Sequence, residues 1–169
     1  MVVIGCGKNS GSAKPALPPP KPVTREVQTE GGSVTRRDTE TKKVLWTVEW
    51  QTATLEYTDD NRFGGMMQDV KGTIYQDGQP ASDFSAQAAV ASKENSTLEL
   101  KGEVTVTSRD PQGQLFCGKV VYNGQIERVE ALENVRAETS SLEVGPFPRV
   151  YARPDLSLIA TPDLYEESK

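Results

Sequence analysis

The feature that most constrains the fold is a short segment in which apolar and polar residues alternate and which recurs along the chain. Residues 97–108 read TLELKGEVTVTS: every second residue from Leu98 to Val106 is apolar or glycine, and the residues between are charged or hydroxylic. Side chains on a β-strand point alternately to its two faces, so this spacing predicts a strand with one apolar face. Residues 69–75, DVKGTIY, form a looser copy thirty positions earlier, with Gly72 in place of Gly102.

Each copy is followed by a turn signal and a returning strand. The first turn is predicted at residues 77–78, Asp-Gly, and Asn-Gly at residues 123–124 marks a later hairpin. Residues 131–138, ALENVRAE, form a third and degraded copy with Asn134 at the glycine position. Repeated units of this length predict an all-β fold, either an antiparallel roll or a sandwich. In the first returning strand, the apolar residues of one parity are Phe84, Ala86, Ala88 and Val90.

The alternating pattern also divides the chain. Residues 44–160 hold the pattern and form the predicted folded body, and residues 161–169 read as a polar tail. Residues 7–43 are predicted to be a disordered linker, because they are rich in proline, poor in apolar side chains and carry a net charge of +4. The charge of the whole chain is −5, so the rest is more acidic still, which argues against nucleic acid as a partner.

The most apolar strand of the body is predicted over residues 44–57, VLWTVEWQTATLEY. Trp46 and Trp50 share one parity, whereas Ala53 belongs to the other. The change of parity near Thr52 predicts a bulge or a bend. Core packing and a place in the wall of a ligand groove both fit the two tryptophans.

Little in the sequence points to catalysis. The chain has no histidine, the commonest general base and a frequent metal ligand, and it has no phosphate-binding loop or dinucleotide motif. We therefore expect neither an enzyme nor a metal or other cofactor. Asp59 and Asp60 favour a hairpin loop over a calcium site, because their spacing matches no calcium loop. Cys117 lies in the strand LFCGKVV, where a small buried residue fits, and we expect neither a disulfide with Cys6 nor a catalytic thiol.

The order of the segments carries a further signal. The tryptophan-bearing strand LWTVEWQTATLEY is followed by MMQDVKGTIYQDG and by FSAQAAVAS, which is similar to an l-x-A-x-x-A pattern. LELKGEVTVTS is similar to an L-x-L-x-G-x-V-x-V signature, and LFCGKVVYNGQIERVEALENVRAE comes next. In this order the segments resemble the LptC family of lipopolysaccharide-export proteins and, more broadly, the LptA/OstA-like β-roll superfamily. The resemblance covers about residues 44–138.

The resemblance implies a twisted, half-open antiparallel β-roll, similar to a jelly roll, whose apolar interior holds acyl chains of lipopolysaccharide or a related glycolipid. Family members receive these chains from an inner-membrane ABC transporter and pass them to a periplasmic bridge protein, so the transporter permeases and an OstA/LptA-like protein are the implied partners. The inner wall of this lipid-binding groove is assigned to residues that alternate inward: Val48, Trp50, Val70, Ile74, Phe84, Ala86, Val90, Leu98, Leu100, Val104, Val106, Leu115 and Val120.

The first residues carry a second resemblance. Val3-Ile4-Gly5-Cys6 is similar to a lipobox, the motif at which a bacterial lipoprotein signal is cleaved and the new N-terminal cysteine is acylated. Residues 1–6 would then be the remnant of a lipoprotein signal, and the body would stand at the periplasmic face of the cell envelope on a lipid anchor. Each acyl methylene in the membrane would contribute about 0.8 kcal/mol. A free thiol on a flexible tail is the alternative for Cys6.

A second function fits the same pattern. The chain could be a cell-envelope lipoprotein whose β-sandwich has a solid core and which binds a protein or a glycan through its acidic outer face. The two functions differ in one structural property, namely whether the interior is an accessible groove or a packed core.

Overall fold

The computed structural model describes residues 23–58, 63–92, 95–110 and 113–168. Most of these residues lie in strands, and the strands form a single antiparallel sheet whose order follows the chain. The all-β prediction is therefore confirmed. The elements are β1 (Thr24–Arg37), β2 (Val44–Thr58), β3 (Phe63–Gln76), β4 (Gln79–Ala91), β5 (Thr97–Ser108), β6 (Gln114–Asn123), β7 (Arg128–Glu138), β8 (Glu143–Ala152), β9 (Ile159–Ala160) and α1 (Pro162–Glu167).

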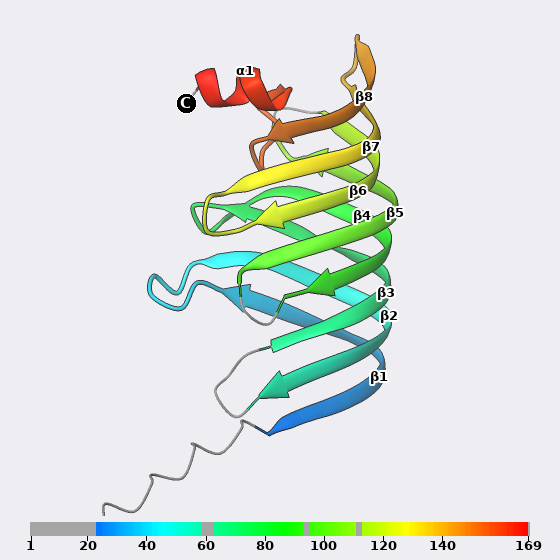
Figure 1. Ribbon diagram of the computed structural model, residues 1–169, viewed down its shortest axis with the longest axis vertical. Helices are drawn as coiled ribbons and strands as arrows, with labels where there is room; N and C mark the ends of the chain where they lie inside the picture. Colours follow the sequence, from blue (N-terminus) through cyan, green and yellow to red (C-terminus); the bar gives the residue numbers. More distant parts are fainter. Residues whose placement is uncertain (1–22, 59–62, 93–94, 111–112, 169) are drawn as a thin grey trace, which may run out of the picture.

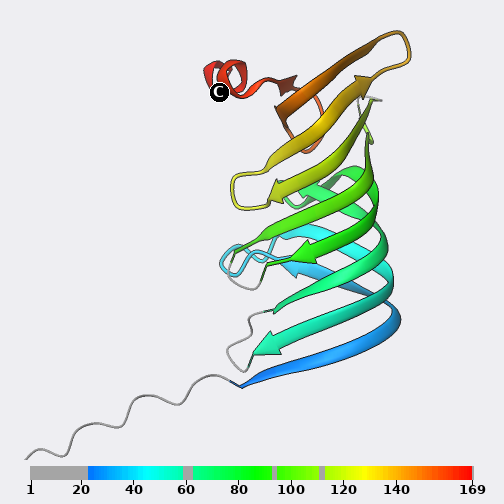
Figure 2. The ribbon, with the colours of Figure 1, turned by 45° about the vertical axis from the view of Figure 1, so that its right-hand side comes forward.

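The sheet is open and strongly bent (Figures 1 and 2). The long strands lie one above another along the molecule, and each bends near its middle, so that the two halves of the sheet face each other. Half A contains the segments that pair with residues 97–101 of β5, from residues 24–30 of β1 to residues 149–152 of β8. Half B contains those that pair with residues 104–108, from residues 32–37 of β1 to residues 143–147 of β8.

Residues with a left-handed backbone conformation, and shifts in the pairing of neighbouring strands, occur at the bends. The ladder between β5 and β6 shifts where Gly102 and Glu103 have φ angles of 76° and 47°. Glu133 and Asn134 have φ angles of 70° and 56° at the corresponding point of β7. An extra residue in one strand of a pair bends that strand. The parity change predicted near Thr52 is one of these bends, because the inward-facing residues of β2 change parity there.

The middle of the roll is closed where the ends of the two halves meet. The Tyr122 hydroxyl of half A donates a 2.7 Å hydrogen bond to the Tyr75 carbonyl of half B. The backbone N–H of Asp77, in the turn after β3, donates to a carboxylate oxygen of Glu127, in the turn after β6, at 2.6 Å. Apolar side chains from both halves form one core cluster behind these contacts.

The prediction of a disordered linker over residues 7–43 is wrong for residues 24–37. These residues form β1 and pair with β2 along their length. β1 is an edge strand and most of its side chains are exposed, so it folds without the apolar alternation that marks the central strands. Residues 1–22, which include Cys6 and the proline cluster, lie outside the described residues.

The prediction of a polar tail over residues 161–169 also needs correction, because residues 162–167 form α1. Tyr165 of α1 is buried and packs edge-on against the ring of Tyr151 in β8, with the ring centroids 5.7 Å apart. Arg128 lies over the Tyr151 ring and reaches a Glu166 carboxylate oxygen at 3.3 Å, which ties the helix to the start of β7. In the described part of the chain, no helix has the length and apolar character needed to cross a bilayer.

Candidate functional site

The residues assigned to the inner wall come together in the interior of the roll. Twelve of the thirteen are buried and belong to the apolar core cluster. They pack together as a core, and three of them, Trp50, Val70 and Val104, also line hollows of about 650 and 350 Å³. Their role in lipid binding stays a prediction. The twelve are Val48, Trp50, Val70, Ile74, Phe84, Ala86, Leu98, Leu100, Val104, Val106, Leu115 and Val120.

The assignment of Val90 to the inner wall is wrong. Val90 is half-buried, and it pairs across the sheet with Met66, whose side chain is exposed. The ladder between β4 and β5 shifts after Ser85, and as a result Ala89 and Ala91 point inward instead. Strict alternation along β4 therefore fails at its bend, and Ala88 is displaced from the inner face for the same reason.

Trp46 and Trp50 both pack in the interior, with 1% and 7% of their surfaces exposed. Their indole N–H groups are buried and have no hydrogen-bond acceptor among the described residues. The indole of Trp50 lies against Gly32 of β1, where an added Cβ would come within 2.6 Å of the ring. The edge strand thus packs against this tryptophan, which also lines a hollow of about 650 Å³ together with Val70. Trp46 packs in the core.

An apolar cavity of about 420 Å³ lies at the end of the roll built by the last strands. Its wall includes the buried residues Val150 and Leu156, and its exposed polar residues are Gln114, Glu138, Thr139 and Thr161. An apolar interior with polar groups at the rim is the usual form of a small-molecule site. The large apolar residues of the wall are Leu142, Val144, Phe147, Val150, Leu156 and Ile159.

The segment 153–158, between β8 and β9, bounds this cavity on the side of the core. Two successive carbonyls of the segment, those of Pro154 and Asp155, accept hydrogen bonds from the hydroxyls of Ser82 and Ser108 at 2.5 and 2.6 Å. Both serines are buried in half B, on β4 and β5, whereas the cavity is lined by β6 to β9. The segment therefore crosses the roll between the closed middle and the cavity.

The sequence pattern did not predict this cavity. Much of its apolar wall comes from residues 142–150, LEVGPFPRV, where apolar residues do not alternate and two prolines interrupt the strand. The available signal was an apolar cluster in a proline-rich stretch, which also fits a plain strand end.

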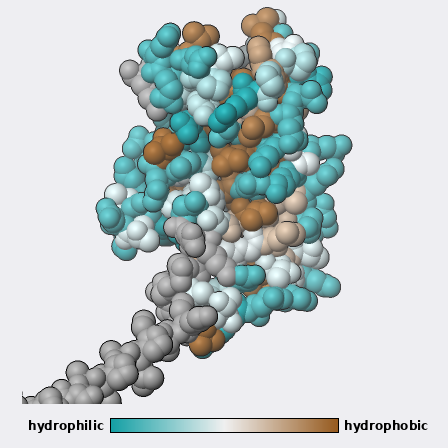
Figure 3. Space-filling view, in the orientation of Figure 1, coloured by the Kyte–Doolittle hydropathy of each residue, from teal (hydrophilic) through white to brown (hydrophobic). Residues whose placement is uncertain are grey.

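On the face shown in Figure 3, hydrophobic residues gather in a broken stripe along the long axis, and hydrophilic residues flank it on both sides.

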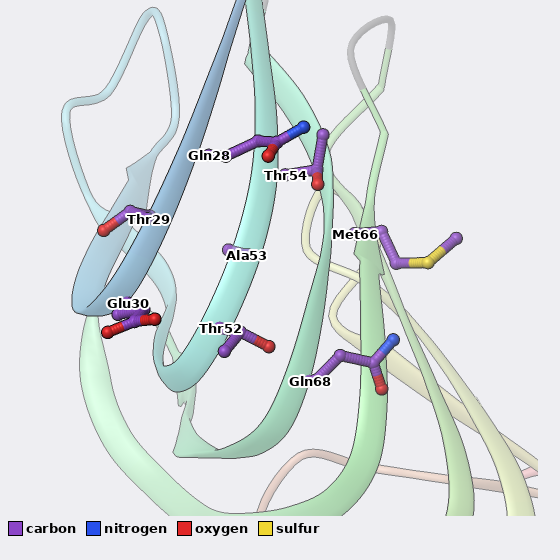
Figure 4. A pocket seen from close by; sticks show the side chains of 8 residues that line it. All are labelled: Gln28, Thr29, Glu30, Thr52, Ala53, Thr54, Met66 and Gln68. Carbon is purple, nitrogen blue, oxygen red and sulfur yellow. The ribbon is translucent and has the colours of Figure 1, made fainter.

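A second cavity lies on the other face of the sheet near the opposite end of the roll, and its lining is mostly polar (Figure 4). Gln28, Thr54 and Met66 are paired across three strands, and Glu30, Thr52 and Gln68 form the next row. These side chains offer amides and hydroxyls, but no charged group besides one glutamate. We assign no chemistry to this surface.

Ion pairs neutralise acidic groups on the outer face of the roll. Glu99 of β5 accepts contacts from Lys101 at 2.6 Å and Lys119 at 3.1 Å. Hydrogen bonding to Lys101 is the main reason why the pKa of Glu99 lies below its usual value. Asp83 and Arg109 form a similar pair, which lowers the pKa of Asp83. The acidic net charge therefore does not amount to an unpaired acidic surface at these positions.

Cys117 is buried in β6, as predicted, and burial raises the pKa of its thiol to about 11. Such a thiol is protonated at neutral pH and is a poor nucleophile. Within the described ranges, no group of three or more histidine, cysteine, aspartate or glutamate side chains could hold a metal ion. Asp59 and Asp60 lie outside those ranges, between β2 and β3.

The fold and the cavity define a class of protein: an all-β protein with an open, bent, sequential antiparallel sheet and an apolar cavity at one end. Comparison with known proteins adds no closer identification. No family model matches the sequence, and no curated protein matches it significantly.

Proposed function

We propose that the protein binds acyl chains of lipopolysaccharide, or of a related glycolipid, at the open end of its β-roll and relays them within a cell-envelope export bridge. The observation that carries this proposal is the apolar cavity of about 420 Å³ between the last strands. Its volume falls within the range of about 300–1,000 Å³ that is usual for small-molecule sites. The resemblance of the sequence to the LptC family supports the choice of ligand.

The lining of the cavity fits a hydrocarbon chain with a polar head. Leu142 and Val144 are exposed at 60% and 39%, so the apolar wall is accessible to a ligand. An acyl chain that leaves a bilayer loses about 0.8 kcal/mol for each methylene exposed to water, and an apolar wall restores this contribution. Gln114, Thr139 and Thr161 are exposed beside the apolar wall, where their neutral amide and hydroxyl groups would face the headgroup.

The free edge of β1 offers a docking site for a partner, at the end of the roll opposite to the cavity. β1 has 14 residues and contains no proline, and in the described part of the chain it pairs with β2 alone. A partner of the OstA/LptA type could add a strand to this edge and extend the sheet. Acylated Cys6 would hold the protein at the periplasmic face of the membrane, next to the transporter permeases. These partners and the anchor belong to the proposal.

Photo-crosslinking at the cavity tests the proposal. The variant Val144→p-benzoylphenylalanine places the reactive group in the wall, and Ile126→p-benzoylphenylalanine serves as the matched control, because Ile126 is 53% exposed and lies outside the cavity. Irradiation with radiolabelled lipopolysaccharide should label the first variant and spare the second, and unlabelled lipid should compete. Equal labelling of both variants, or none, contradicts the proposal.

One observation favours the second candidate, an envelope module that binds a protein or a glycan. The predicted inner wall is a packed core in the middle of the roll, which is what a solid sandwich requires. In that case lipopolysaccharide would not label Val144→p-benzoylphenylalanine. The cavity would then be a hollow beside the packed core that binds no lipid.

A further inference from the structure

The inner boundary of the apolar cavity contains a residue in an unfavourable backbone conformation. Leu156 has a φ angle of 56°, in the left-handed region that leucine rarely adopts. Its side chain is nevertheless buried, with 8% of its surface exposed, and it forms part of both the cavity wall and the core cluster. A conformation of this kind costs about 1–3 kcal/mol and persists only where the surroundings fix it.

The surroundings fix Leu156 from both sides of the segment. The carbonyls just before it accept the hydrogen bonds of the buried Ser82 and Ser108, in half B of the sheet. The backbone N–H of Leu156 donates to the Arg153 carbonyl at 3.0 Å, and the N–H of Arg153 donates to the Leu158 carbonyl at 3.0 Å. The segment is thus a tight turn held across the roll, and it places one isobutyl group in the cavity wall on the side of the core.

We infer that Leu156 is the end stop of the cavity and sets the length of the hydrocarbon chain that the cavity accepts. The inference rests on the proposed function and adds a specificity-determining residue to it. A straight chain that enters past Leu142 and Val144 meets Leu156 before it reaches the closed middle of the roll. Only methylenes short of that point are buried, so chains beyond a limiting length gain no further affinity.

Binding of straight-chain saturated fatty acids of 8 to 18 carbons to the full chain, measured by fluorescence competition below their critical micelle concentrations, tests the inference. In the unmodified protein, affinity should rise about fourfold for each added methylene and then reach a plateau at the limiting length. Leu156→Gly removes the side chain and tolerates the positive φ, so the plateau should move to chains longer by at least two carbons. Leu156→Phe should move it to shorter chains and tests the same point if the glycine variant does not fold.

Leu142→Ala is the matched control, because this leucine lines the same cavity but is 60% exposed. It should weaken binding of all chains by a similar factor and leave the limiting length unchanged. If both Leu156 variants keep the original plateau, the end stop is wrong while acyl binding stands. If the unmodified protein binds none of the chains, the proposed function fails and the end stop with it.

Discussion

Gly72 and Gly102 hold matching positions in the sequence repeat, but the structure needs them for different reasons. Gly102 lies at the bend of β5 and has a φ angle of 76°, which favours glycine. Gly72 has no such angle. A Cβ on Gly72 would clash with the backbone carbonyl oxygen of Thr47 in the neighbouring strand and would come within 2.6 Å of the Phe84 ring. The bend of β3 falls instead at Asp69, with a φ angle of 50°.

Gly72→Ala should therefore destabilise the protein although alanine is a small residue. The clash is with backbone in a central part of the sheet, and overpacking of this kind costs about 1–3 kcal/mol. Urea denaturation followed by circular dichroism measures the change. Gly113→Ala is the control, because the nearest atom to its added Cβ is 3.6 Å away, and it should leave the free energy of unfolding nearly unchanged. Equal stability of the two variants would contradict the packing at Gly72.

At the scale of elements, the sequence predicted the strands with a buried apolar face and missed the elements that lack one. The alternation in β5 is preserved through its bend, so Leu98 and Val106 are both inward, as expected. In β4 the bend reverses the parity within a run of alanines, where no change of residue type reveals it, and Val90 was misplaced for that reason. β1 is mostly exposed and α1 is short, so neither produces a clear apolar period.

The cavity illustrates the same limit, because it depends on contacts between distant elements. The hydroxyl of Ser82 donates a hydrogen bond to the segment 153–158 from a strand some seventy residues earlier in the chain. No local sequence pattern predicts such a contact. Alternation specifies which face of a strand is apolar. It does not specify where two halves of a sheet close on each other and where they stay apart.

The serine contacts make a prediction for the segment 153–158. Ser82→Ala and Ser108→Ala should each lower the free energy of unfolding by about 1–2 kcal/mol, because each leaves a carbonyl of the segment without its buried donor. Hydrogen exchange of the Leu156 amide should also accelerate. Ser85→Ala, on the exposed side of β4, provides the control and should change neither quantity. Unchanged exchange in both serine variants would mean that the turn is held by its backbone bonds alone.

At the scale of the whole molecule, the roll is closed in its middle and covered by β1 at one end. The edge strand lies over Trp50 and pairs with β2, so it belongs to the fold and is not part of a tether. A chain without β1 would expose the edge of β2 and uncover part of the core. The boundary of the folded domain therefore lies near residue 24 and not at residue 44.

Removal of residues 1–43 tests this boundary. The shortened protein should melt at a lower temperature than the full chain, and the emission of Trp46 and Trp50 should shift to longer wavelength as water reaches the indoles. Differential scanning calorimetry and tryptophan fluorescence provide the two measurements. An unchanged melting temperature together with unchanged emission would show that β1 contributes nothing to the core.

The two margins of the sheet are unequal. At one edge, β1 is a long strand without proline that can form further backbone hydrogen bonds. At the other edge, β8 is interrupted by Pro146 and Pro148, β9 has two residues and α1 packs against β8. A subunit with one edge strand open to pairing can form a dimer with a copy of itself or lie at the end of a linear assembly. It cannot be an interior subunit of a long polymer. Addition of strands should stop on the β9 side of this chain, so the chain would stand at the end of any row of joined sheets that includes it.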